Sequence, residues 1–126
     1  MAKNRVLATP GELIEAPVPT GTKSGEPVLL WGAVPAVAQT DEGGGVGAVA
    51  GRASCEAGGV WSLPCADAVN AEGTPLYIVA ATRAITTTSA GNVAFGWSVH
   101  VPSPVARSGG TKAAGAGNVN VRLAKV

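Results

Sequence analysis

Large aromatic side chains are scarce in this sequence, which has three Trp, one Tyr and one Phe among its 126 residues. Glycine is abundant, with 18 residues, and alanine and valine supply much of the rest. A core built from small side chains stabilises a domain of this size only modestly, and association with further subunits can supplement it. Because domains most often contain ~100–150 residues, the composition favours a single domain that serves as a subunit of a larger assembly.

Charged residues are also few, at 13% of the chain, whereas about 25% is typical of soluble proteins. Nine Lys or Arg residues balance eight Asp or Glu residues, and they form no basic cluster. Nucleic-acid binding normally depends on a dense basic patch that displaces counterions. We therefore expect no nucleic-acid partner.

No apolar run is long enough to cross a bilayer. The longest apolar window, 27–38, is interrupted by Pro35 and is shorter than the ~20 residues that a spanning helix needs. The start of the chain lacks a continuous hydrophobic segment. We expect no membrane partner, no signal peptide, and synthesis in the cytosol.

Residues suited to catalysis or metal binding are rare. His100 is the only histidine, and the only cysteines are Cys55 and Cys65. Metal sites usually need four closely spaced ligands, so we expect no metal, no cofactor and no small-molecule substrate. In a reducing compartment we expect two buried thiols, with a disulfide or a reactive thiol as alternatives. A Ser-His-Asp arrangement with Asp41 or Asp67 stays open, but nothing resembles a nucleophile elbow, and we predict that the protein is not an enzyme.

The glycine-rich segment 43–51 invites comparison with a phosphate-binding loop. Such a loop needs a Gly-Lys pair followed by Ser or Thr at the start of a helix, and this chain contains no Gly-Lys pair. A dinucleotide fingerprint would need a βαβ unit around the glycines, which the sequence does not predict. We interpret the segment as a flexible turn between strands.

Strand patterns dominate the rest of the chain. Apolar side chains alternate with small or polar ones over 93–101, 119–123 and 49–63, and this period of two predicts strands with one buried face. The pattern places Trp97 and Cys55 on buried faces. The pair Gly58-Gly59 predicts a bulge or bend within the third strand. The most helix-like segment, 66–73, is short.

Two further segments share a pattern: SGEPVLLW at 24–31 and EGTPLYIV at 72–79 both place Gly and Pro before four apolar residues. We interpret each as a turn whose Pro begins a strand, where no ladder donor is needed, although so short a match can arise by chance. The unbroken apolar runs predict strands covered on both faces, as in a small barrel or at a subunit contact.

The first nineteen residues contain four turn-forming residues, Pro10, Gly11, Pro17 and Pro19, and show no clear strand alternation. We predict an extended N-terminal arm over 1–19 and a single mainly β domain, a small barrel or sandwich with long Gly/Pro-rich loops, over 20–126. The arm mixes cationic and apolar side chains suited to lying along another protein. The candidate contact residues are Lys3, Arg5, Val6, Leu7, Leu13 and Ile14.

The order of several motifs along the chain resembles the capsid decoration, or cement, proteins of tailed bacteriophages. The motifs are MAKN at 1–4, KSGEPVLLWGAVPAVAQTD at 23–41, GGVWSLP at 58–64, AEGTPLYIV at 71–79, TTTSAGNVAFGWSV at 86–99 and GNVNVRLAKV at 117–126. Some relatives carry a label as RecA/RadA-like recombinases, which the missing phosphate loop and the neutral charge make implausible here. The sequence departs from the family pattern in a longer 102–118 loop and in its two cysteines.

The resemblance implies a β-rich structural protein of the virion, a homotrimer on the exterior of the capsid that reinforces joints between copies of the major capsid protein. Two other functions stay open. A carbohydrate- or host-surface-binding module would expose aromatic side chains, and the strand context of Trp31, Trp61 and Trp97 predicts that these are not exposed. A nucleic-acid-handling protein would show salt-dependent DNA binding.

Overall fold

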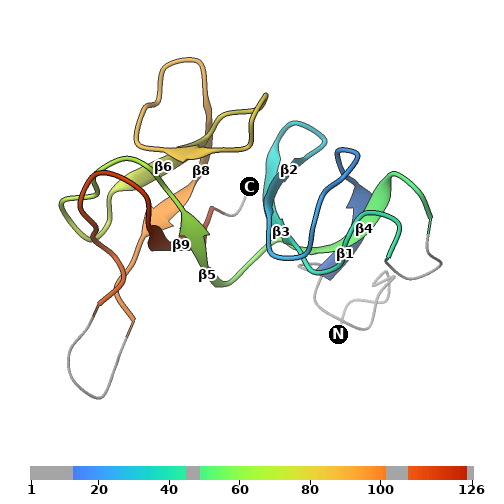
Figure 1. The fold of residues 1–126 in the computed structure, drawn as a ribbon, viewed down its shortest axis with the longest axis horizontal. Coiled ribbons are helices and arrows are strands. Elements are labelled where there is room, and N and C mark those ends of the chain that lie inside the picture. Colours follow the sequence, from blue (N-terminus) through green and yellow to red (C-terminus); the bar gives the residue numbers. More distant parts are fainter. Residues whose placement is uncertain (1–12, 45–48, 102–107, 125–126) are drawn as a thin grey trace, which may run out of the picture.

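The computed structural model describes residues 13–44, 49–101 and 108–124, and these ranges contain β-strands and no helix. The strands form two antiparallel sheets that lie side by side in Figure 1. Their bounds are β1 Leu13–Pro17, β2 Pro27–Leu30, β3 Val34–Ala38, β4 Arg52–Glu56, β5 Val60–Pro64, β6 Pro75–Ile78, β7 Ile85–Thr86, β8 Val93–Ser98 and β9 Asn118–Leu123. The expectation of a mainly β chain, barrel-like or sandwich-like, is confirmed.

The four-stranded sheet has the order β1-β4-β3-β2 and curls into a half-barrel (Figure 1). Its concave side encloses a core of small side chains, since alternate residues of each strand point inward. The buried members of this core are Ala16, Val18, Val28, Leu30, Ala36, Ala53 and Cys55. Pro35 is tolerated inside β3 because β4 pairs only with Val37 and Ala38, so that part of β3 needs no donor on the β4 side.

The five-stranded sheet has the order β5-β9-β8-β6-β7 and carries the larger core. Phe95 is fully buried at its centre. The alternation predicted at the end of the chain is confirmed, since Val119, Val121 and Leu123 are buried. The remaining buried members are Val37, Leu63, Cys65, Val69, Leu76, Ile78 and Ile85.

Strands β2 and β3 of the four-stranded sheet contribute side chains to both cores. Val28 and Leu30 face the half-barrel core, whereas Leu29 and Val37 pack against the core of the five-stranded sheet. Residues 28–30 of the apolar run therefore have both faces of their strand covered, as the sequence predicts, whereas Trp31 lies beyond β2 and is exposed. The segments 24–31 and 72–79, which share a sequence pattern, also share a local structure. In each of them the strand begins at the Pro, and the preceding glycine has positive φ: +89° at Gly25 and +84° at Gly73.

The expectation of an irregular arm is wrong for its last residues, since 13–17 form β1 and pair with β4. Ile14 packs against the half-barrel core, and Ala16 and Val18 are buried in it, so this segment alternates with period two. The intervening prolines mask the pattern, but β1 is an edge strand and accepts Pro17. Residues 1–12 lie outside the described part of the chain.

The expectation of one bent strand over 49–63 is also wrong. The segment forms β4 in the four-stranded sheet and β5 in the five-stranded sheet, and Gly58-Gly59 is the crossing between them. Gly59 has φ +89°, a conformation that side chains rarely adopt. The alternation on either side is real, but it belongs to two strands in two sheets.

A β-bulge reverses the expected facing of the second half of β8. Leu76 pairs with Gly96 while Tyr77 pairs with Ala94, so Phe95 is an extra residue on β8. Beyond the bulge Ser98 is buried and Trp97 is 42% exposed, which overturns the expectation of a buried Trp97. Gly96 is required here, because a Cβ would lie 2.1 Å from the carbonyl oxygen of Arg122.

Candidate interaction surface

The outer face of the five-stranded sheet, opposite its core, presents a row of exposed side chains from four strands. Trp97 on β8 pairs with Pro75 on β6 and with Arg122 on β9, and Arg122 pairs with Val60 on β5. Paired residues point to the same side of a sheet, so the four side chains lie next to one another. All four are exposed, with Val60 at 45% and Trp97 at 42%. We call this set the outer row.

The five-stranded sheet is almost without charge. Its five strands contain a single charged residue, Arg122, whereas the four-stranded sheet has Glu15, Arg52 and Glu56. An antiparallel sheet with one solvated face normally alternates apolar inward residues with polar or charged outward ones. An outward row of Trp, Val and Pro around one cation is instead typical of a protein interaction surface.

A second exposed tryptophan lies at the tip of the β2–β3 hairpin. The amide of Ala33 donates to the carbonyl of Leu30 at 3.0 Å, and Trp31 and Gly32 occupy the turn with φ of 51° and 73°. Positive φ at both central positions is typical of a type I′ turn, which favours Asn and Gly and strains a bulky residue. Trp31 is 62% exposed, so most of its surface gains no contact with the described fold in return for this strain.

Exposure of Trp31 and Trp97 corrects the prediction that all three tryptophans are shielded within strands. Trp61 alone behaves as expected, since it is half-buried, packs against the larger core and donates its Nε1–H to the carbonyl of Gly58 at 2.7 Å. The argument against a carbohydrate- or surface-binding module therefore loses its basis.

The residues predicted to contact a partner fall into two groups. Lys3, Arg5, Val6 and Leu7 lie outside the described residues. Leu13 and Ile14 lie on β1, where they pair with Glu56 and Cys55 of β4. Because the side chain of Ile14 packs against the half-barrel core, it contributes to the fold of the domain itself.

Arg83 links the β6–β7 turn to the loop before β2. Its guanidinium donates to the Oγ1 of Thr22 at 3.0 Å and lies 3.6 Å from a carboxylate oxygen of Glu26. Arg83 is the second non-glycine residue with positive φ, at 60°, and it closes the β6–β7 turn by donating its amide to Val79. It also lines a cavity of about 450 Å³ between the start of β2 and the end of β5. Within this cavity the charged groups pair with each other, so the lining presents no free acid or base.

The possible catalytic residues are engaged elsewhere. The Nδ1 of His100 accepts from the amide of Gly110 at 3.0 Å, and among the described residues neither Asp41 nor Asp67 is bonded to this imidazole. Asp67 accepts from the Oγ1 of Thr86 at 2.6 Å and from the amide of Thr87 at 3.0 Å. These hydrogen bonds lower the pKa of Asp67, and they fix the loop after β5 against β7. No group of three or more His, Cys, Asp or Glu in the described ranges could hold a metal ion.

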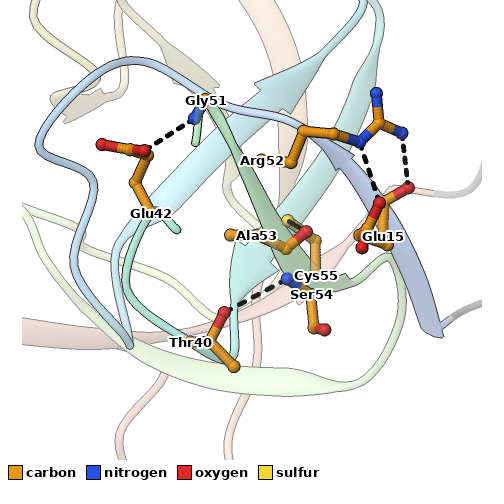
Figure 2. Close-up of polar contacts among 8 residues, drawn as sticks. All are labelled: Glu15, Thr40, Glu42, Gly51, Arg52, Ala53, Ser54 and Cys55. Carbon is orange, nitrogen blue, oxygen red and sulfur yellow. Dashed lines mark hydrogen bonds and ion pairs between the residues drawn. The ribbon is translucent and has the colours of Figure 1, made fainter. Parts of the chain in front are cut away.

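The glycine-rich turn is closed by protein groups (Figure 2). A carboxylate oxygen of Glu42 accepts from the amide of Gly51 at 2.6 Å, on the donor side where a phosphate loop would bind an anion. Nearby, the Oγ1 of Thr40 accepts from the amide of Ser54, and Arg52 forms an ion pair with Glu15 at 2.9 Å (Figure 2). The turn holds β4 in place and gives no sign of a phosphate site in its described residues.

Both cysteines are free and buried, as predicted. Cys55 lies in the half-barrel core and Cys65 in the larger core. Burial raises the pKa of the Cys55 thiol above its usual value, which keeps the thiol protonated and unreactive.

In the described ranges there is no helix of the length and apolarity that a membrane span requires.

An exposed apolar row on a nearly uncharged sheet is typical of proteins that act through contact with other proteins. Comparison with known families agrees. The model of the phage cement protein family matches residues 8–123, and the chain belongs to this family of phage structural proteins. No curated protein and no solved structure matches it.

Proposed function

We propose that this protein binds the outer surface of a phage capsid and reinforces the contacts between copies of the major capsid protein. The observation that carries the proposal is the family match over residues 8–123. The exposed outer row and the hairpin Trp31 support it, because apolar side chains removed from water on binding contribute roughly 25 cal/mol per Å². The protein is made in the cytoplasm of the host bacterium and ends on the exterior of the virion.

Adhesion of this kind needs no reacting groups. It needs a sheet that keeps its shape, side chains that are exposed before binding, and weak repulsion between neighbouring copies on a crowded shell. The chain has a formal net charge of +1, so copies that sit close together repel one another little.

We further propose that the protein is a homotrimer on the capsid and that residues before β1 help to anchor it. The small-side-chain cores support self-association, since they leave little stabilisation to a lone domain. The anchor candidates before β1 are Lys3, Arg5, Val6 and Leu7, with Leu13 at the edge strand itself.

The direct test mixes purified protein with undecorated capsids and examines them by electron microscopy. We expect added density on the outer surface at joints between capsid subunits, and greater resistance of the decorated capsids to heat. Capsids that stay bare at saturating protein would refute the proposal. Mass measurement of the protein in solution and counting of copies per density test the trimer.

Exposure of Trp31 and Trp97 favours a second candidate, a carbohydrate- or host-surface-binding module on the virion. Aromatic faces are common platforms for sugar rings and for other protein surfaces. Binding of the purified protein to a glycan panel or to whole host cells, lost in Trp31→Ala or Trp97→Ala, would support this function. DNA binding that weakens with salt would instead support a nucleic-acid-handling protein.

A further inference from the structure

The outer row has a chemical character that specifies a partner. Around it the face is uncharged: Ser62, Pro64, Asn118 and Asn120 continue it along β5 and β9, and the Nδ2 of Asn118 donates to the Oγ of Ser62 at 3.2 Å. Among the described residues of this face Arg122 is the single cation, with Val60 opposite it on one side and Trp97 on the other.

Arg122 differs from the other cations in the described part of the chain. Lys23, Arg52 and Arg83 each lie within ion-pair distance of a carboxylate. Lys112 donates to three backbone carbonyls. Among the described residues Arg122 has neither kind of partner, and none of the five strands of its sheet carries a carboxylate.

We propose that the outer row is the surface that seats on the capsid, and that Arg122 there pairs with a carboxylate of the major capsid protein. This inference rests on the proposed capsid binding and adds which face binds and what chemistry the capsid supplies. Charge complementarity favours an occupant that supplies a carboxylate. A second copy docked two-fold through the same face would bring Arg122 against Arg122 with no carboxylate to neutralise either, which is unfavourable.

The neighbours of Arg122 make the pairing strong. When a partner covers Trp97, Val60 and Pro75, water is excluded around the guanidinium, and a charge-assisted hydrogen bond gains strength as the local dielectric falls. The same exclusion penalises a partner that offers no carboxylate, because the buried cation would then be unpaired. The apolar row supplies contact area, and Arg122 supplies the orientation and the choice of partner.

The test measures the affinity of full-length variants for undecorated capsids by cosedimentation. Arg122→Glu should weaken binding at least tenfold, and Trp97→Ala at least fivefold. Arg122→Gln should reduce the dependence of the dissociation constant on salt, because the variant lacks the screened ion pair. The matched control is Lys23→Glu, which makes the same charge change at a side chain 68% exposed in the loop before β2. It should bind capsids as the unmodified protein does.

Each outcome decides between the two proposals. If the unmodified protein leaves capsids bare, the proposed function fails and this inference fails with it. If the unmodified protein binds and Arg122→Glu and Trp97→Ala bind equally well, only the choice of face is wrong. Equal weakening by Arg122→Glu and Lys23→Glu would mean general electrostatics and would also overturn it. A loss of self-association in the Arg122 and Trp97 variants, with capsid affinity of the remaining subunits unchanged, would assign the face to contacts between copies.

Variants that fail to fold are recognised before binding is measured. Both side chains are exposed, so thermal melting and circular dichroism of the variants should match those of the unmodified protein. Val60→Ser on the neighbouring edge strand provides an independent change to the same row. Preserved capsid affinity in Val60→Ser and Trp97→Ala together would contradict an apolar contact even if one Arg122 variant were unstable.

Discussion

At the scale of single residues, Trp31 is the clearest case of stability given up at an exposed position. A non-glycine residue in the left-handed region costs roughly 1–2 kcal/mol. Trp31 adopts φ 51° with most of its indole in solvent, so the described fold gains little in return. A strained, exposed aromatic residue at a hairpin tip is consistent with a contact that forms only in the assembled virion.

Trp31→Asn should therefore raise the free energy of unfolding by about 1 kcal/mol, because Asn followed by Gly32 is a favoured pair for a type I′ turn. Urea denaturation measures the change. Trp31→Ala is the control, since it removes the indole but keeps a side chain that disfavours positive φ, and it should give little or no gain. Equal stabilisation by both variants would mean that the indole, not the backbone strain, is the unfavourable feature.

Asp67 gives a prediction about pH. Its pKa is lowered in the folded state by the hydrogen bond from Thr86 and then by that from the amide of Thr87. A carboxyl group with a lowered folded pKa stabilises the fold above its unfolded pKa, near 3.9, and loses that contribution as pH falls through the folded value. Asp67→Asn should destabilise the protein at pH 7 and flatten the loss of stability below about pH 4. Chemical denaturation from pH 7 to pH 2.5 checks this.

Thr86→Val provides the second arm of that test, since it removes the hydroxyl that donates most strongly to Asp67. Its loss of stability below about pH 4 should be smaller than in the unmodified protein, because without this hydrogen bond the folded pKa of Asp67 moves toward the unfolded pKa. An acid limb that is identical in all three proteins would show that Asp67 does not govern it.

At the scale of elements, the sequence predicts β6, β8 and β9 well because their alternation or their Gly-Pro entry is local. It fails where a distant strand decides the outcome. The bulge at Phe95 depends on how β6 pairs with β8, and it alone turns Trp97 outward. The outer row follows from pairings among four strands, so its only local trace is a lone Arg122 within apolar segments. Strand β1 is hidden by prolines that an edge strand tolerates.

The β6–β7 turn is tied to the loop before β2, because its Arg83 bonds to Thr22 and pairs with Glu26 of that loop. Arg83→Ala should lower the free energy of unfolding by about 1–2 kcal/mol through loss of a charged hydrogen bond to a buried hydroxyl. Arg83→Gly should lose less, by about 1 kcal/mol, since glycine adopts φ 60° without strain. Thermal melting compares the stabilities of the two variants. A lower stability of Arg83→Gly than of Arg83→Ala would contradict the strain argument.

For the whole molecule, the boundary between anchor and domain lies before β1. Deletion of residues 2–12 removes Lys3, Arg5, Val6 and Leu7 but no described strand, whereas deletion of 2–16 also removes most of β1. The longer deletion takes Ile14 and Ala16 from the half-barrel core, together with the Glu15–Arg52 ion pair, and leaves the edge of β4 unpaired. Loss of one small-residue core strand of this kind should lower the melting temperature by roughly 5 °C or more.

The shorter deletion should keep the melting temperature nearly unchanged and weaken capsid binding tenfold or more, which corresponds to about 1.4 kcal/mol. Segments that order on binding lose conformational entropy of ~1–2 kcal/mol per residue, so an anchor must gain larger contacts on its partner to contribute at all. Differential scanning calorimetry and capsid cosedimentation of both deletions separate the two roles. Capsid affinity unchanged in the 2–12 deletion would leave the outer row as the sole anchor, and a large loss of stability there would place part of 2–12 within the domain.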